Sequence, residues 1–347
     1  MKRLSIFMMA AICCAVSIKA PAQNSDPFEG LKAFTNFSKI DIKRLLEGEI
    51  LSQRGPLMTF PQGVSSQLCF AVPATPLETV KRLQTWDPTR CSTLKIYAAH
   101  WLQDPCELKE FSRLSLLLDP GIRPLKRLLD QTLATSASSS GLNLSRIEAA
   151  ELAGCVGKDS SPKTVGSCWA RLLFARAADF QHKGFAGALP YELDIESVTS
   201  VSHLRSMLEE QIQVSREFAP LLQRSGLITS GAGIAPLRPC YYWRLFEADH
   251  HATLSLGAVY ELDLGDRFQL LEIAYYVSGI FYTSATLYEI WPIRAGGKTG
   301  SLVWCNVLCS APTLRFAAGL ERLASGVILT LEFKKLIRCF QDTFKTP

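Results

Sequence analysis

The chain closes on FAAGLERLASGVILTLEFKKLIRCFQDTF, residues 316–344, a stretch with the apolar spacing of one long helix. One set of apolar residues recurs at three- and four-residue intervals and defines one helix face: Leu320, Leu323, Ala324, Val327 and Leu331. A second set falls on roughly the opposite face: Leu329, Phe333, Leu336, Ile337 and Phe340. A helix that is apolar on both sides is expected to be covered on more than one side.

Two glycines interrupt this helix. Gly319 and Gly326 are seven residues apart and therefore fall on one side of it. Each costs about 1 kcal/mol relative to Ala in a helix interior, so a packing reason for them is expected. They leave room either for a ligand or for a close neighbour. The alternative is plain packing of the helix on a sheet, without a cavity.

Five apolar runs precede the helix, and they are rich in aromatic and β-branched residues, as strands are. The runs are Tyr242–Ala248, Ala252–Leu264, Phe268–Val277, Ile280–Ile293 and Ser301–Leu308. A Gly-rich turn at 296–300 separates the last two. A meander of antiparallel strands that ends in one long helix predicts an α+β fold, with a curved sheet wrapped around the helix.

The earlier part of the chain has a different pattern. Val64–Val72 is typical of a strand, and Thr75 followed by Pro76 predicts the start of a helix that ends near Trp86. From Pro105 to about Arg224 the apolar residues have helical spacing. We expect this block, about 105–225, to be a helical insertion. It should dock on the open side or rim of the sheet within one compact domain.

The first 22 residues have the pattern of a secretory signal peptide. Lys2 and Arg3 precede an apolar segment that is too short to span a membrane, and Ala20-Pro21-Ala22 fits a cleavage site. The sequence therefore predicts an exported protein, periplasmic or secreted, whose mature chain is a single domain over 23–347. Cleavage removes three basic residues and no acidic ones, so the formal net charge falls from +5 to +2. Such a charge gives no electrostatic reason to expect nucleic acid or an acidic membrane surface as a partner. No later apolar run is long enough for stable membrane insertion to be expected.

Cysteine usage is compatible with export. Nine of the eleven cysteines lie beyond the signal peptide, and an odd number leaves at least one thiol unpaired within the chain. Cys91 with Cys106, or Cys155 with Cys168, would close short loops. Buried free cysteines are an equally good interpretation, and the sequence does not choose among these.

The element order resembles the START-like, or helix-grip, superfamily. The opening match is Val64–Val72 leading through Pro73-Ala74-Thr75-Pro76 into a helix that ends at Trp86-Asp87-Pro88. The closing match is Tyr275–Ile293 and Ser301–Leu308 leading to Leu320-Glu321-Arg322-Leu323-Ala324-Ser325-Gly326. The resemblance implies an antiparallel sheet wrapped around a long C-terminal helix. The helical block at 105–225 is longer than the usual insertion of this superfamily.

In the resembled superfamily, the space between sheet and helix binds hydrophobic ligands such as lipids, sterols or polyketides. Such a site needs a concave apolar wall and a few polar groups. The candidate ligand-binding residues are Tyr242, Tyr276, Phe281, Tyr282, Trp291, Trp304, Gly319 and Gly326. Because about half of the residues in a strand face one side, core packing is the alternative for each aromatic residue.

Catalytic motifs are scarce in this chain. The sequence contains no H-E-x-x-H, P-loop, G-x-S-x-G or G-x-G-x-x-G pattern, so neither a metal nor a cofactor is expected. Asp249-His250-His251 could supply a base oriented by a carboxylate, or form a polar turn between Glu247 and Ala252. We therefore predict an exported binding protein for an apolar, lipid-like small molecule rather than an enzyme. The alternatives are a cyclase or hydrolase of the same fold using Asp249/His251 or Tyr282, and a scaffold protein with a filled cavity.

Overall fold

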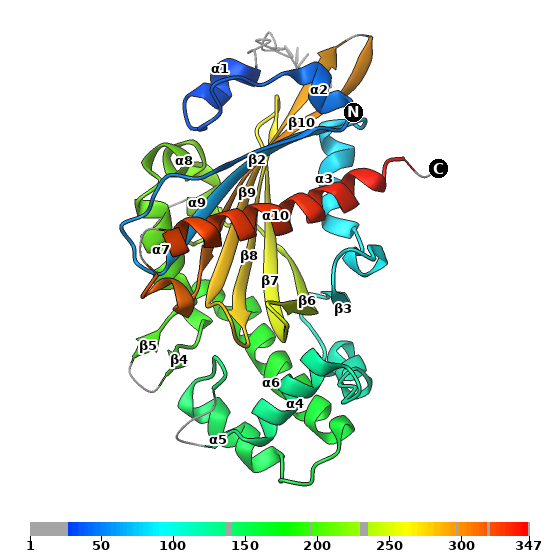
Figure 1. Cartoon of the computed structure of the whole chain (residues 1–347), viewed down its shortest axis with the longest axis vertical. Helices are drawn as coiled ribbons and strands as arrows, with labels where there is room; N and C mark the ends of the chain where they lie inside the picture. The colour runs from blue at the N-terminus through cyan, green and yellow to red at the C-terminus, as the bar shows by residue number, and fades with distance from the viewer. Residues whose placement is uncertain are drawn as a thin grey trace, which may run out of the picture.

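The computed structural model describes residues 27–136, 141–193, 196–229, 235–295, 297–317 and 320–345. The signal peptide predicted over residues 1–22 lies outside these residues. The described chain has an α+β fold, in which one eight-stranded antiparallel sheet carries helices on both faces (Figure 1). The α+β prediction with a long closing helix is therefore confirmed.

The strands of this sheet follow the order β1-β2-β10-β9-β8-β7-β6-β3, and neighbouring strands are antiparallel. In chain order they are β1 (Ile50–Arg54), β2 (Gly63–Val72), β3 (Ile96–Leu102), β6 (Cys240–Ala248), β7 (His251–Asp263), β8 (Phe268–Val277), β9 (Thr283–Ala295) and β10 (Lys298–Ser310). Strands β6 to β10 form the meander predicted from the five apolar runs. The chain passes from β2 to β3 at the far edge, so β2 is left to pair with β10.

The long helix α10 (Leu320–Asp342) crosses one face of the sheet (Figure 1). It lies chiefly over β1 and β2, and its second apolar set packs inward through Ile337 and Phe340. The expectation that the helix is covered on more than one side is wrong for part of the first set. Val327 and Leu331 of this set are about half exposed, and the neighbouring Ile328 is 60% exposed. The spacing of apolar residues identifies two apolar faces of this helix, but it does not identify which face packs against the sheet.

Helix α3 (Pro76–Thr85) and the short η1 (Pro88–Arg90) lie on the same face as α10. Thr75 caps α3 by accepting a hydrogen bond from the backbone N–H of Glu78, whose carboxylate accepts one from the backbone N–H of Thr75. This capping box confirms the start predicted from Thr75 and Pro76. It fixes α3 beside the C-terminal half of α10.

The other face of the sheet carries the remaining helices. They are α1 (Pro27–Lys32), α2 (Ile42–Leu46), η2 (Leu108–Leu116), α4 (Arg123–Leu133), α5 (Arg146–Cys155), α6 (Pro162–Lys183), η3 (Gly184–Gly187), α7 (Ser200–Glu209), α8 (Ile212–Glu217) and α9 (Ala219–Arg224). The small pair β4 (Tyr191–Glu192) and β5 (Ser197–Val198) and the turn η4 (Pro312–Leu314) complete the described elements. Buried side chains of the helical block and of the sheet form one apolar cluster, in which Phe180 stacks on Tyr275 at 3.7 Å.

Two disulfides are present among the described cysteines. Cys155 pairs with Cys168, one of the two short loops that the spacing allows. Cys91 pairs instead with Cys339, 248 residues away, and Cys106 is free. The second bond joins the segment after η1 to α10.

Candidate functional site

The structure distributes the predicted ligand-binding residues over both faces of the sheet. Tyr242 faces α10. Four others belong to the apolar cluster on the opposite face: Tyr276, Tyr282, Trp291 and Trp304. Phe281 lies in the turn between β8 and β9, and Gly319 lies outside the described residues. These side chains therefore do not converge on one cavity.

Gly326 faces β1 and β2 rather than open space. A methyl group added there would lie 3.4 Å from Cδ of Arg54 and 3.5 Å from Cγ2 of Val64, which is ordinary or slightly tight contact. Gly326→Ala should therefore stabilise the fold by up to about 1 kcal/mol through helix propensity. Gly326→Leu should instead overpack the contact and cost about 1–3 kcal/mol. Urea unfolding measures both changes.

The matched control for these variants is Gly154→Leu. Gly154 lies near the end of α5 with nothing within 4 Å of an added methyl group, so Leu is expected to be tolerated there. A Gly326→Leu protein as stable as the Gly154→Leu protein would show that α10 has free space beneath it, contrary to this packing.

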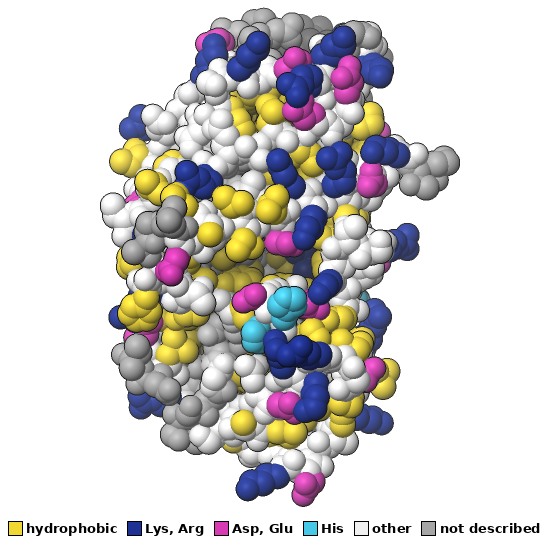
Figure 2. All heavy atoms as spheres, in the orientation of Figure 1, with side chains coloured by type: hydrophobic (Ala, Val, Ile, Leu, Met, Phe, Trp, Pro, Cys, Tyr) yellow, Lys and Arg dark blue, Asp and Glu magenta, His cyan; other side chains and the backbone are white. Residues whose placement is uncertain are grey.

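A pocket does lie on the α10 face, between α10, α3, the segment before β3 and the sheet. Its apolar wall is formed by Phe70, Leu83, Trp86, Pro88, Ile96, Trp101, Val259, Leu270, Leu336, Ile337 and Phe340. Figure 2 shows a hollow with hydrophobic side chains on its floor on the face that carries α10. The cavity volume is about 40 Å³. This is room for about three water molecules, so a larger guest requires the wall to move.

Three polar side chains line the sheet side of this pocket, Arg244, Glu272 and Tyr288, and Tyr242 contacts Glu272 beside it. Arg244 on β6 donates to the carboxylate of Glu272 on β8 at 2.8 Å. The Tyr242 hydroxyl donates to the same carboxylate at 2.9 Å, and the Tyr288 hydroxyl donates to its other oxygen at 3.3 Å. The Arg244 guanidinium also lies 3.9 Å from the centre of the Tyr242 ring. Glu272 thus accepts hydrogen bonds from three side chains. In the described contacts, Arg244 donates to Glu272 through one of its five N–H groups.

One glycine makes this arrangement possible. Tyr242 pairs with Gly257 on β7, and Gly257 lies between the strands that carry Arg244 and Glu272. A side chain at position 257 would lie about where the Tyr242 ring is, 2.1 Å from its Cζ atom. The bare backbone therefore lets the Tyr242 ring cross β7 and reach Glu272, the kind of close approach that explains a glycine inside a strand.

Burial sets the protonation state of the two tyrosines. It raises the pKa of Tyr242 and of Tyr288 well above the ordinary value, and the nearby Glu272 adds to the rise. Both hydroxyls therefore stay protonated at neutral pH and act as donors. The site can bind an oxygen acceptor through Arg244, but its described residues include no histidine.

The residues proposed for catalysis lie elsewhere. Asp249 and His250 form the turn between β6 and β7, both with positive φ, so the interpretation of this tripeptide as a polar turn is confirmed. The ring Nδ1 of His251 lies 2.7 Å from the backbone carbonyl of Asp249. Tyr282 is on the opposite face of the sheet, against His203 and Tyr191. The structure thus does not bring these groups to the pocket.

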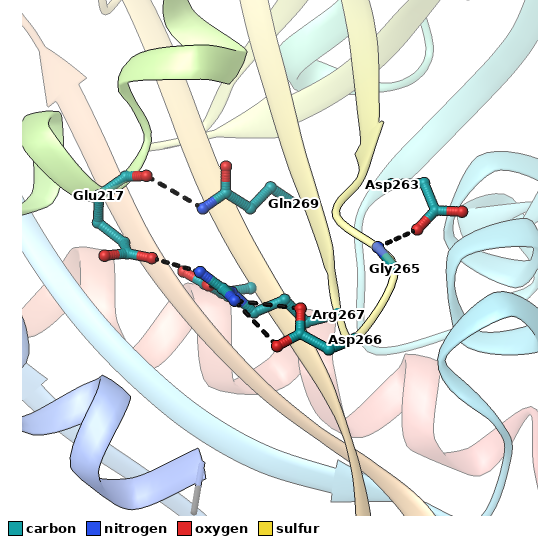
Figure 3. A network of polar contacts seen from close by, with 7 residues as sticks. Glu217, Asp263, Gly265, Asp266, Arg267 and Gln269 are labelled. Atoms are coloured by element: carbon teal, nitrogen blue, oxygen red, sulfur yellow. Dashed lines mark hydrogen bonds and ion pairs between the residues drawn. The ribbon is translucent and has the colours of Figure 1, made fainter. Parts of the chain in front are cut away.

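A second set of polar residues lies under α8 on the opposite face (Figure 3). Arg267 bridges Glu289 at 2.5 Å and Glu217 at 3.0 Å, and Gln269 donates to the backbone carbonyl of Glu217. Six fully buried side chains in this region each have one polar atom without a partner among the described residues: Gln67, Gln211, Gln269, Glu289, Trp304 and Asn306. We call these six residues, together with Arg267 and Glu217, the buried polar cluster. Its hydrogen bonds and ion pairs hold α8 on the sheet.

Sequence reasoning named Tyr242 but missed Arg244, Glu272 and Tyr288. Arg244 and Glu272 are charges inside runs that are mostly apolar, and Gly257 lies in the middle of a long apolar run. Charged residues within buried strands are the informative exceptions to burial, so this signal was available. The contact between Arg244 and Glu272 across β7 could not be predicted without knowing how β6, β7 and β8 are paired.

Other classes of site have little support in the described chain. Its His, Cys, Asp and Glu residues form no group of three that could hold a metal ion. None of its helices combines the length and apolar character needed to cross a membrane. Comparison with family models, curated proteins and solved structures finds no match to this chain.

Proposed function

We propose that this protein is an exported, START-like binding protein that holds a small apolar molecule between its sheet and α10. The element order supports the helix-grip part of the proposal: β2 leads into α3, β6 to β10 form the meander, and α10 closes the chain across the sheet. The observation that carries the proposal is the Arg244–Glu272 pair at the wall of an otherwise apolar pocket. An apolar wall with a few oriented polar groups is the usual composition of a small-molecule site.

Charge balance indicates which head group this ligand carries. Arg244 and Glu272 together are neutral, and both side chains are about three-quarters buried. An added carboxylate would bring an uncompensated negative charge next to Glu272, which is costly at low dielectric. A carbonyl, ester or amide oxygen would accept a hydrogen bond from Arg244 without that cost. We therefore propose a ligand with an apolar body and a neutral oxygen acceptor.

The test begins with the purified protein and mass spectrometry of its organic extract. Binding is then measured by displacement of the neutral fluorescent probe N-phenyl-1-naphthylamine with decanamide and with decanoate. The amide should bind at least about tenfold more tightly, a difference of about 1.4 kcal/mol. In Glu272→Gln, Arg244 loses its counter-charge, so the preference should move toward decanoate.

The control variant is Glu332→Gln on the outer surface of α10, where Glu332 pairs with the exposed Lys335. It should leave the preference unchanged. Tighter binding of decanoate by the unaltered protein would contradict the neutral head group. Absence of any extract, together with absence of probe uptake by both the oxidised and the reduced protein, would contradict binding altogether.

The small cavity favours a second candidate function. A volume of about 40 Å³ is far below the roughly 300–1,000 Å³ of ordinary ligand pockets. A scaffold protein whose pocket is filled by its own side chains would have such a volume. The same displacement experiment separates the two, because a scaffold takes up no probe.

Export is the remaining part of the proposal. The signal-like residues 1–22 support it, and two disulfides are compatible with an oxidising compartment. N-terminal sequencing of the exported protein should begin at Gln23.

A further inference from the structure

The Cys91–Cys339 disulfide joins two walls of the pocket. Trp86, Pro88 and Ile96 of the pocket wall lie on either side of Cys91 in the chain. On α10, Leu336, Ile337 and Phe340 of the opposite wall surround Cys339. One covalent bond therefore fixes the separation between α10 and the segment that runs from α3 to β3.

Several non-covalent contacts also hold this end of α10, including hydrogen bonds from Arg82 to the Thr343 carbonyl and from Arg338 to the Gly48 carbonyl. The Phe340 ring lies 5.7 Å from Trp86 and 6.4 Å from Phe70. The Gln341 side chain donates to the backbone carbonyl of Ala71 at 3.0 Å. The N-terminal half is held on β2 by separate groups, including the Thr330 hydroxyl, which lies 2.7 Å from that of Ser66. Outward movement of the C-terminal half has to break these contacts as well as the disulfide, but it would open the pocket without detaching the N-terminal half.

We propose that the Cys91–Cys339 disulfide is a clasp that limits access to the pocket, and that a dithiol opens it by reduction. This inference rests on the proposed binding function. The cavity is too small for an apolar ligand unless a wall moves, and the clasp restrains the two walls whose separation must change. A pocket that opens only transiently binds slowly, because association then waits for the conformational change.

The chemistry of opening is ordinary thiol–disulfide exchange. Cys91 is partly exposed whereas Cys339 is buried, so the thiolate of the dithiol attacks Sγ of Cys91. The bond to Cys339 breaks and Cys339 leaves as a thiolate that takes up a proton. The second thiol of the reductant then resolves the mixed disulfide. Two electrons and two protons end on Cys91 and Cys339, and the dithiol becomes a cyclic disulfide.

The chain provides a matched control, because Cys155–Cys168 lies in the helical block and no pocket residue belongs to α5 or α6. Stopped-flow uptake of N-phenyl-1-naphthylamine is measured on the unaltered protein, on Cys91→Ser/Cys339→Ser and on Cys155→Ser/Cys168→Ser. Removal of the clasp should raise the association rate constant about tenfold or more. Removal of the control disulfide should leave it unchanged.

A second measurement covers the case in which the clasp variant does not fold. In Cys155→Ser/Cys168→Ser the clasp is the only disulfide of the described chain, so dithiothreitol acts on it alone. Faster uptake with an unchanged far-UV circular dichroism spectrum supports the clasp. Uptake at the oxidised rate, or unfolding on reduction, overturns it.

These results separate the two proposals. Equal uptake rates in all forms leave the binding function standing and overturn the clasp. No uptake by any form, oxidised or reduced, overturns both. Uptake by the reduced form alone supports both.

Discussion

Replacing Arg176 by methionine should destabilise the protein by about 3–5 kcal/mol, the cost of leaving one partner of a buried ion pair alone. Arg176 on α6 and Glu148 on α5 form a bidentate pair whose side chains are 5% and 7% exposed. Without the guanidinium, the Glu148 carboxylate stays in an apolar region with no cation to balance it. Urea unfolding followed by far-UV circular dichroism measures the loss.

The effect should extend beyond the helical block. The Arg176 guanidinium lies 4.2 Å from the centre of the Tyr276 ring on β8, so the pair also connects α6 to the sheet. Glu148 accepts from the backbone N–H and the hydroxyl of Ser145 in the capping box of α5. If the block and the sheet unfold as one domain, circular dichroism and tryptophan fluorescence should give the same lowered midpoint. Two separate transitions would contradict the single domain.

A double variant isolates the pair itself. Glu148→Gln keeps an oxygen for the capping box but removes the charge, so Arg176→Met/Glu148→Gln should recover most of the lost stability. The control is Lys126→Met, which breaks the exposed pair of Lys126 with Asp130 and should cost no more than about 0.5 kcal/mol. If Arg176→Met alone lowers the free energy of unfolding no more than this control does, the Arg176–Glu148 pair is not buried, contrary to the structure.

Local signals predicted the elements well because their causes are local. The capping box at Thr75 starts α3 at the position that the sequence indicated. The apolar runs became the strands of the meander with small changes at their ends. The turn at Asp249 and His250 also followed from neighbouring residues alone.

Which strand residues face α10 could not be predicted in the same way. Both faces of the sheet are covered, so strands such as β9 are apolar on both sides and alternation gives no direction. Trp291 therefore resembled a pocket residue although Ile290, beside it, faces α10. The Arg244–Glu272 contact spans 28 residues and the Cys91–Cys339 bond spans 248. Both depend on which segments become neighbours in the fold.

Glu289, in the buried polar cluster, should make stability fall as the pH rises. Its side chain is wholly buried on β9, one oxygen accepts from Arg267 and the other has no partner among the described residues. Burial, with Glu217 nearby, raises the pKa of Glu289 from 4.5 to about 8, although Arg267 opposes the shift. The carboxyl is therefore protonated in the folded protein at neutral pH.

The sign follows from proton binding in the two states. Between pH 4.5 and about 8 the folded state keeps a proton on Glu289 that the unfolded state has released. Stability from this group is fully present below pH 4.5 and is lost as the pH rises through about 8. A shift of this size corresponds to about 4–5 kcal/mol. Burial lowers the pKa of His203, so this residue makes stability rise with pH near its ordinary pKa. The pH dependence of the unaltered protein therefore combines the contributions of Glu289 and His203.

Comparison with Glu289→Gln isolates it. Gln has nearly the shape of protonated Glu and keeps an oxygen for Arg267, so both proteins should be similarly stable near pH 5. By about pH 9 the variant should be the more stable by up to about 4–5 kcal/mol, because it has no carboxyl to ionise. Glu332→Gln, on the exposed face of α10, should follow the unaltered protein throughout. Parallel stability curves for Glu289→Gln and the unaltered protein would mean that Arg267 keeps Glu289 ionised in the folded state, contrary to the raised pKa.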